Sequence, residues 1–418
     1  MGELTRLRLS SSRPPAPAPA PAPPEEDDDL LSEILLRLPP LPSSLPRASL
    51  VCNRWRGLVS APAFLRRFRA HHRRRVGGPP PPLLGFFEDA LYGVSFTATL
   101  DAPDRIPDGR FSRRFDDGGS APIVLGCRDG LVLILDPTYP LGQIGVLIWD
   151  PVTGDQRRLT VPPALDDGYT EIYNGALLRA AAGARGGNHR FQFQLVMVGV
   201  DRKHTRAIAC VYSSEAGVWG DLISAPLVSM SYHTVVSMSI SSTLVGNSLY
   251  WSVFGNSAYG ILEFDLDTQR LAVIPVPVSS SSSVNWSFWA MPMEDGGIGF
   301  LYLLDFSTQL WKRTTDRDGD VSWVLAKTIE LDKLLSLDKK KSCPMMLGFS
   351  DCNNVVFFLT VTGLVMVQFE SMQFKKLAHT RLDLSLVHPH VVHPFSTVYT
   401  ADMGTGVGDD RAELLDST

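Results

Sequence analysis

The sequence predicts an α+β protein with two folded parts, a small unit of three helices followed by a large all-β domain. Apolar residues recur at helical spacing only over residues 27–70. From Leu83 to about Thr400, short apolar runs are broken by Gly, Asp, Asn and Pro, as in arrays of strands. The stretch GGPPPP at 77–82 separates the two parts as a linker. A chain of 418 residues is long enough for two or three folded units.

The first predicted helix has a one-sided apolar face, as an amphipathic helix does. Its members are Leu30, Leu31, Ile34, Leu35 and Leu38. Five acidic residues at 25–29 precede this face and suit the positive end of a helix dipole. Pro39 and Pro40 end the helix, because proline lacks the amide that a helix interior needs.

Two more helices are predicted before residue 70. Ser43 or Ser44 can cap the second. Its apolar face comprises Leu45, Ala48, Val51, Cys52 and Trp55. Pro62 can open the third, with Phe64, Leu65 and Phe68 directed inward. A unit of this size buries little apolar surface, so either another protein or the rest of this chain must cover it.

The pattern LLSEILLRLPP…SLPRASLVCNRWRGLVS…FLRRF resembles the F-box, above all its plant type. The shared marks are Ile34-Leu35, Arg37-Leu38-Pro39, Leu50-Val51-Cys52 and Trp55 between two arginines. The resemblance covers about a tenth of the chain and implies docking onto the Skp adaptor of a cullin-RING ubiquitin ligase. One departure is that Asp27 and Asp28 replace the usual Leu-Pro before the first helix.

The resemblance also implies which side chains contact the adaptor. They are Leu30, Leu31, Ile34, Leu35, Leu38, Pro39, Leu45, Val51, Cys52, Trp55 and Leu58.

Composition excludes several classes of protein. With 39 basic and 44 acidic residues, the chain lacks the excess of basic residues expected of a nucleic-acid-binding protein. Five scattered cysteines fit a reducing compartment, and residues 1–12 lack the apolar core of a signal peptide. Residues 222–262 carry no charged side chain, but small polar residues recur there as in strands, so no membrane span is expected. These observations favour the cytoplasm, the nucleus or both.

The segments outside the two folded parts are low in complexity or charged. Residues 1–26 hold an alternating Pro-Ala tract that we expect to be disordered, and 401–418 form a Gly- and acid-rich tail with the same expectation. Residues 66–75 hold six arginines and two histidines, a basic run that continues into the linker at 71–82. A solvated helix end explains this run better than a nuclear-import signal, which remains the alternative.

A weak repeat runs through the β domain at 83–400. An apolar strand ends in an aromatic and an acidic residue, a polar turn follows, and a second strand begins. The copies are Ile148–Leu159, Glu263–Pro275 and Gln368–Leu377. Each copy predicts the two outer strands of a propeller blade, and at about 40–50 residues a blade the domain would hold about six or seven. Gly126–Val132 and Trp149–Gly154 also resemble the propeller-like C-terminal domains of plant F-box proteins.

Motifs for chemistry are weak. The sequence HPHVVHP places His388, His390 and His393 close together, but no Cys or carboxylate stands at ligand spacing, so we expect no metal. A calcium loop that began at DRDGD (316–320) would need Gly and Glu where Val321 and Lys327 stand, so this stretch predicts a tight turn instead. The acid pairs at 116–117 and 166–167 lie in Gly-rich turns.

An aromatic segment could line a recognition surface, although a place in the blade core explains it better. It contains Trp286, Phe288 and Trp289, with Trp311 further along the chain. The sequence therefore predicts the substrate receptor of a Skp–cullin–F-box ligase, without catalytic residues, cofactors, nucleic acid or membrane. The alternative is a propeller that acts outside the ligase as a scaffold, a sugar reader or a hydrolase. The target protein is not predicted.

Overall fold

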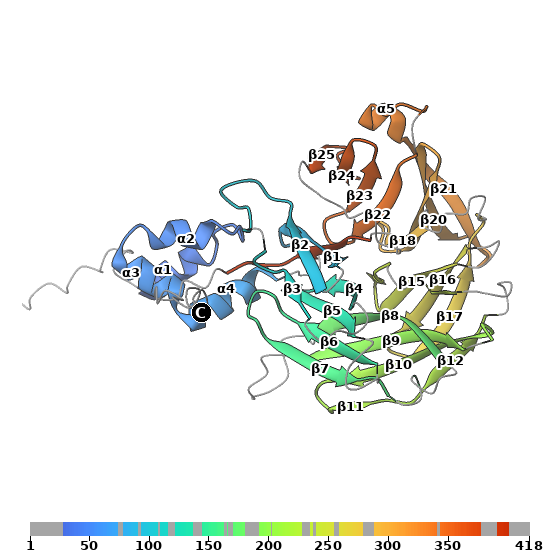
Figure 1. Cartoon of the computed structure of the whole chain (residues 1–418), viewed down its shortest axis with the longest axis horizontal. Coiled ribbons are helices and arrows are strands. Elements are labelled where there is room, and N and C mark those ends of the chain that lie inside the picture. Colours follow the sequence, from blue (N-terminus) through green and yellow to red (C-terminus); the bar gives the residue numbers. More distant parts are fainter. Residues whose placement is uncertain are drawn as a thin grey trace, which may run out of the picture.

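A computed structural model of the chain shows a helical unit beside a β domain (Figure 1). The predicted head at 1–26, the tail at 401–418 and both acid pairs lie outside the described residues. The structure describes residues 28–73, 78–90, 93–107, 109–115, 122–136, 144–162, 165, 170–179, 192–201, 203–227, 235–236, 240–254, 259–278, 288–340, 343–377 and 391–400.

The helical unit, residues 28–73, contains four helices where the sequence predicted three. They are α1 (Asp28–Leu35), α2 (Ser44–Ser49), α3 (Asn53–Ser60) and α4 (Pro62–His72). The second predicted helix is divided because Cys52 adopts an extended conformation and its Sγ accepts a hydrogen bond from the Trp55 amide at 3.5 Å. Cys52 is thus an N-cap, and Leu50 and Val51 lie in the turn before it.

The β domain is a propeller of six four- or five-stranded sheets among the described residues, which confirms the predicted fold class. We number the six blades in chain order. The first three contain β26 (His393–Ser396), β1 (Leu83–Ala90), β2 (Gly93–Ala98) and β3 (Arg113–Arg114); β4 (Ile123–Arg128), β5 (Leu131–Asp136), β6 (Gly145–Trp149) and β7 (Gln156–Thr160); and β8 (Thr170–Arg179), β9 (Phe193–Asp201), β10 (Arg206–Ser213), β11 (Val218–Trp219) and β12 (Ile223–Pro226).

The last three blades follow the same antiparallel plan. They contain β13 (Val235–Val236), β14 (Thr243–Val245), β15 (Ser248–Phe254), β16 (Tyr259–Asp265) and β17 (Arg270–Pro275); β18 (Phe288–Pro292), β19 (Ile298–Leu304), β20 (Ser307–Thr315) and β21 (Val321–Glu330), followed by the short helix α5 (Leu331–Leu335); and β22 (Met345–Ser350), β23 (Val355–Thr360), β24 (Gly363–Gln368) and β25 (Phe374–Leu377).

The two ends of the β domain meet in the first blade. Its innermost strand, β26, comes from the C-terminal end of the described chain and pairs with β1 from the beginning of the domain. The innermost strands also contact one another around the axis, β26 with β4 and β22, and β4 with β8. The ring is therefore closed by pairing between residues about 300 positions apart in the chain. This pairing holds both ends of the β domain in the same blade.

The predicted outer hairpins are confirmed. Strand β6 pairs with β7, β16 with β17, and β24 with β25. In the first of these turns the Asp150 carboxylate accepts the Val152 amide at 3.0 Å, and Gly154 takes φ +77°. In the second, the Asp265 carboxylate accepts the Thr268 amide at 2.7 Å. In these two turns an acidic residue at the end of the strand thus closes the turn, as Asp does at local backbone amides.

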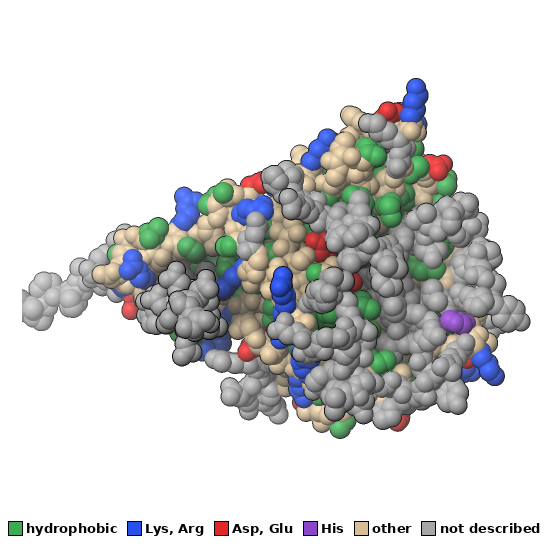
Figure 2. Space-filling view, viewed as in Figure 1, with side chains coloured by type: hydrophobic (Ala, Val, Ile, Leu, Met, Phe, Trp, Pro, Cys, Tyr) green, Lys and Arg blue, Asp and Glu red, His purple; other side chains and the backbone are tan. Residues whose placement is uncertain are grey.

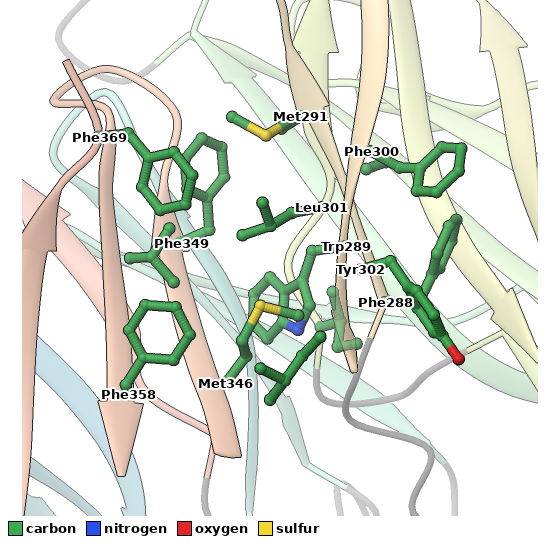
Figure 3. Packing of buried hydrophobic residues seen from close by; sticks show 14 of the residues in the cluster. Phe288, Trp289, Met291, Phe300, Leu301, Tyr302, Met346, Phe349, Phe358 and Phe369 are labelled. Carbon is green, nitrogen blue, oxygen red and sulfur yellow. The ribbon is translucent and has the colours of Figure 1, made fainter. Parts of the chain in front are cut away.

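The core consists of side chains packed between neighbouring blades (Figure 3). Phe288 and Trp289 are buried on opposite sides of the fifth blade, as expected for blade core, and Trp311 is half-buried. The Phe288 ring stacks on Tyr259 of the fourth blade with centroids 5.3 Å apart. Trp286 lies outside the described residues. Residues 316–320 form the turn between β20 and β21, where the Asp316 carboxylate accepts the Asp320 amide at 2.9 Å.

Candidate functional site

The helical unit exposes a group of large apolar side chains, which we call the apolar face. Its members are Leu30, Ile34, Leu41, Leu50 and Val51. Leu50 is 76% exposed and Val51 61%, both in the turn before Cys52. Leu30 and Ile34 stand four residues apart on α1 and therefore share one side of the helix. Figure 2 shows hydrophobic side chains on the surface of the helical unit. Several large apolar side chains exposed on one small unit make it a candidate protein-binding surface.

The eleven predicted contact residues do not all reach this surface. Those that are exposed are Leu30, Ile34, Pro39, Val51 and Cys52. Those that are half-buried are Leu38, Trp55 and Leu58. Leu31, Leu35 and Leu45 are at most 3% exposed and lie in the core of the helical unit. Leu41 and Leu50 are exposed but were not in the predicted set. The spacing of apolar residues does not show which of them are buried and which are exposed, because these short helices carry apolar residues on both their inner and outer sides.

Polar contacts fix the helices behind the apolar face. The Arg54 Nε lies 2.8 Å from the Asp28 carboxylate, which joins α3 to the first turn of α1. Arg67 on α4 forms an ion pair with Glu33 on α1, and His72 Nε2 lies 2.8 Å from the Leu36 carbonyl oxygen. Exposed ion pairs add little stability. Their contribution here is to set the position of α1, which carries Leu30 and Ile34.

The helical unit is attached to the propeller by the chain that follows β26 (Figure 1). Val398, 4% exposed, belongs to the core of the helical unit although it follows the last strand. Arg69 Nη1 donates to Thr400 Oγ1 at 3.3 Å, and the Ser43 amide donates to the Asp104 carboxylate at 2.8 Å. Burial at this junction lowers the pKa of Arg69. These contacts hold the apolar face in a fixed position relative to the propeller.

A half-buried arginine joins three blades of the propeller. Arg128, at the end of β4, donates from Nη1 to the Asp351 carboxylate at 2.9 Å and from Nη2 to the Ser242 carbonyl oxygen at 2.7 Å. It thereby connects the second, fourth and sixth blades. Asp351 is therefore held in an ion pair that joins the second blade to the sixth.

His393 is the only histidine of HPHVVHP within the described residues, and it lies in β26. Its side chain is fully buried, and Nδ1 lies 3.0 Å from Ser241 Oγ. Burial lowers the pKa of His393 to about 3, so the imidazole is neutral in the folded protein. No group of three or more His, Cys, Asp or Glu in the described part of the chain is arranged to hold a metal ion.

Two carboxyl groups on β1 have raised pKa values. Burial raises the pKa of Asp89 to about 6 and also raises that of Glu88. The Asp89 carboxylate accepts the Val124 amide at 2.8 Å, and Glu88 accepts Ser95 Oγ at 3.0 Å. Asp89 therefore links the first blade to the second, and its buried position in this link explains its raised pKa.

Across the described residues, no helix is both long enough and apolar enough to span a bilayer.

Comparison with known proteins identifies both parts of the chain. The F-box domain matches residues 27–67. The family described as "F-box protein AT5G49610-like, beta-propeller" matches residues 123–401, about two thirds of the chain. The protein belongs to this family of F-box proteins. No curated protein matches the chain significantly.

Several solved propellers resemble this F-box protein at low identity. The Dos1 propeller is 12% identical with a TM-score of 0.35, over 68% of this chain and 66% of that one, just under two thirds. The Penicillium chrysogenum α-L-arabinanase bound to arabinobiose is 13% identical with a TM-score of 0.30, over 58% and 82%. Apo AztD from Citrobacter koseri is 9% identical with a TM-score of 0.30, over 74% and 96%. The propeller assignment rests on the six sheets and the family match.

The F-box match relates the apolar face to a known class of protein-binding domain. F-box domains as a class bind Skp1-type adaptors of cullin-RING ligases, and in this protein the domain ends within α4. The family match begins at β4, so the strands β1 to β3 that complete the first blade lie before it.

Proposed function

We propose that this protein is the substrate-receptor subunit of a Skp–cullin–F-box ubiquitin ligase. The observation that carries the proposal is the apolar face, which stands on a domain that matches the F-box. We assign adaptor contact to its five residues together with Pro39 and Cys52, which are also exposed. The buried residues Leu31, Leu35 and Leu45 support this surface from below.

The propeller would hold the target protein. Its attachment through Val398 and Thr400 fixes the distance and direction from the adaptor to any protein bound on the blades. A receptor of this kind needs no catalytic residue, because it works by raising the effective concentration of the target near the ubiquitin-conjugating enzyme. None of the five cysteines, all within the described residues, forms a disulfide, which fits the reducing cytoplasm or nucleus as the place of action.

Adaptor binding tests the proposal. We would measure the affinity of purified Skp adaptor for the full chain, for the double variant Ile34→Asp/Val51→Asp, and for Val218→Asp as a control. Val218 is 60% exposed but lies on β11 in the third blade, far from the helical unit in the fold. A buried carboxylate without a partner is strongly unfavourable in an interface, so the double variant should bind at least about 100-fold more weakly.

The control variant should bind like the wild type, and circular dichroism should show that all three proteins are folded. If the wild-type chain does not bind the adaptor, the receptor function is wrong and the propeller acts outside the ligase. If the double variant binds as tightly as the wild type, the assigned face is wrong.

A further inference from the structure

The outermost strands of the six blades differ in length and composition. Strand β3 is two arginines, β7 reads QRRLT, and β25 reads FKKL. Strands β11 and β12 have two and four residues, and β17 has six and begins with Arg270. Short or basic edges discourage other chains from pairing with them. Strand β21 is longer than all of these, with ten residues, VSWVLAKTIE, of which only Lys327 is basic.

Strand β21 is also exposed. Val321 is 51% exposed, Val324 50% and Leu325 43%. Within the described residues β21 pairs with β20 on one side and with no strand on the other. An outermost strand presents unpaired main-chain amides and carbonyls along its free side. Exposed valine and leucine beside such groups favour the addition of another strand.

Neighbouring blades hold β21 in place. Trp323 Nε1 donates to the Pro275 carbonyl oxygen of the fourth blade at 2.9 Å, and its ring lies 4.9 Å from that of Phe300. Further along, Ile329 is buried in the core, and Lys327 Nζ lies 3.7 Å from Met372 Sδ of the sixth blade. A strand fixed in this way loses little conformational freedom on binding, which favours affinity.

The regular part of the edge is short. The pairing of β21 with β20 shifts register between Leu310 and Trp311, which leaves Ala326 as an extra residue. Such a bulge bends a strand and interrupts its ladder. The usable edge is therefore Val321–Leu325, which we call the edge segment. Asp318 and Asp320 precede it in the exposed turn, and Lys327 follows it, so its two ends differ in charge.

We propose that the edge segment docks an extended stretch of a partner protein, which adds a fifth strand to the fifth blade. Main-chain hydrogen bonds would supply affinity and alternate side chains specificity. The stretch would be apolar at alternate positions, with a basic residue toward Asp318 and Asp320 and an acidic residue toward Lys327. That the partner is a ligase target rests on the proposed function, whereas strand addition does not.

A segment of a target fits the edge better than a second copy of this chain. Pairing over five residues buries on the order of a few hundred Å² per partner, below the roughly 1,000 Å² in total that a stable interface needs. A receptor can use such a weak site, because a target is held only for the time of ubiquitin transfer. A stable dimer cannot rest on this contact alone.

Selection of peptides tests the docking edge without knowledge of the target. A phage library of random ten-residue peptides would be selected on the full chain, and the affinities of enriched peptides would be measured by fluorescence polarisation. The same peptides would be tested on Val324→Lys, on Val321→Lys and on the control Leu222→Lys. Leu222 is 45% exposed and precedes β12 in the third blade.

We expect enriched peptides to alternate apolar residues and to bind each edge variant at least about tenfold more weakly, because lysine opposes strand addition. The Leu222→Lys control should bind them like the wild type. N-methylation of the peptide amides that face the edge should weaken binding about tenfold, and methylation of the intervening amides should have little effect, because strands pair through alternate residues.

Failure to enrich peptides, or equal affinity for wild type and edge variants, would overturn the docking edge. Self-association of the wild type that Val324→Lys abolishes, seen by analytical ultracentrifugation, would replace the target segment with a second copy. All variants should bind the Skp adaptor normally, which also shows that they are folded. Loss of adaptor binding by the wild type would refute the receptor function and leave strand addition standing.

Discussion

Two of the exposed apolar regions of the molecule differ in what they offer a partner. The apolar face of the helical unit offers mainly side chains, because the main chain of α1 is hydrogen-bonded within the helix and the amides of Leu50 and Val51 donate to carbonyl oxygens of α2. The edge segment of β21 offers side chains and a free main chain together. The first can bind only a surface of matching shape, whereas the second can bind many sequences that adopt an extended conformation. One region therefore suits a constant adaptor and the other a variable target.

The two regions also rest on cores of different size. The apolar face is supported by a small core of the helical unit, to which Val398 contributes from the far end of the chain. The edge segment is supported by the large core shared by the fourth, fifth and sixth blades. Loss of stability should therefore remove adaptor binding before it removes binding at the edge.

The largest expected difference is between two adjacent residues of α1. Leu35 is 1% exposed and Ile34 47%. Leu35→Asp buries a carboxylate in the helical core and should lower its free energy of unfolding by about 4 kcal/mol or more, whereas Ile34→Asp should change it by less than about 0.5 kcal/mol. Hydrogen exchange of α1–α4 measures both. Both variants should lose adaptor binding, and equal protection of the two would contradict the assignment of core and face.

Acid should weaken the closure of the propeller. The folded-state pKa of His393, about 3, lies below the unfolded value near 6.5, so its contribution to stability is complete above pH 6.5 and is lost as the pH falls toward 3. At pH 5 this loss amounts to about 2 kcal/mol. Asp89, whose raised pKa favours the folded state as the pH falls, opposes this loss in any variant that keeps it. Urea unfolding at pH 7 and pH 5 should therefore show a loss of stability about 2 kcal/mol greater in the wild type than in His393→Gln. The same pH dependence in both would contradict the prediction.

Truncation of Val398 should affect one region only. Val398→Ala leaves a small cavity in the helical core and should lower its stability by about 1.5 kcal/mol. Hydrogen exchange should rise in α1–α4 and stay unchanged in β18–β21, and proteolysis near residue 78 should quicken. The exposed substitution Val361→Ala serves as a control in the sixth blade. Equal loosening of both regions would show that the helical unit and the propeller unfold together.

The smallest effect is expected at the edge itself. Val324→Lys places a charge at a half-exposed position and should change the free energy of unfolding by less than about 0.5 kcal/mol, as surface substitutions do. Thermal unfolding would measure this change. A melting temperature lowered by several degrees would show that Val324 belongs to the core and would remove it from the docking edge.

The sequence was informative where the cause is local. The turns after Trp149 and Phe264 were predicted from an acidic residue at the end of a strand, and the structure shows its carboxylate bonded to the amides that follow. The helix α1 could be predicted from spacing, but the division of its apolar residues between core and surface could not, because Leu31 and Leu35 are buried while Leu30 and Ile34 are exposed. The break at Cys52 could not, because Leu45 to Trp55 keep a helical period across two helices and only the extended backbone at Cys52 separates them.

The remaining features depend on contacts between distant parts of the chain. The pairing of β26 with β1 joins two segments with no shared local pattern. The burial of Val398 among the helices depends on where β26 ends. Strand β21 looks like any amphipathic strand in sequence, and its exposure follows only from its place as the outermost strand of the fifth blade.

Ubiquitin transfer tests the central claim most directly. The full chain would be combined with ubiquitin, Skp adaptor, cullin, RING subunit, and the ubiquitin-activating and ubiquitin-conjugating enzymes. Attachment of ubiquitin to lysines of the F-box protein itself would be measured. We predict transfer that requires the adaptor, is lost in Ile34→Asp/Val51→Asp and is retained in Val218→Asp. Absence of transfer to the wild type, or equal transfer to the double variant, would contradict a receptor that joins the ligase through the apolar face.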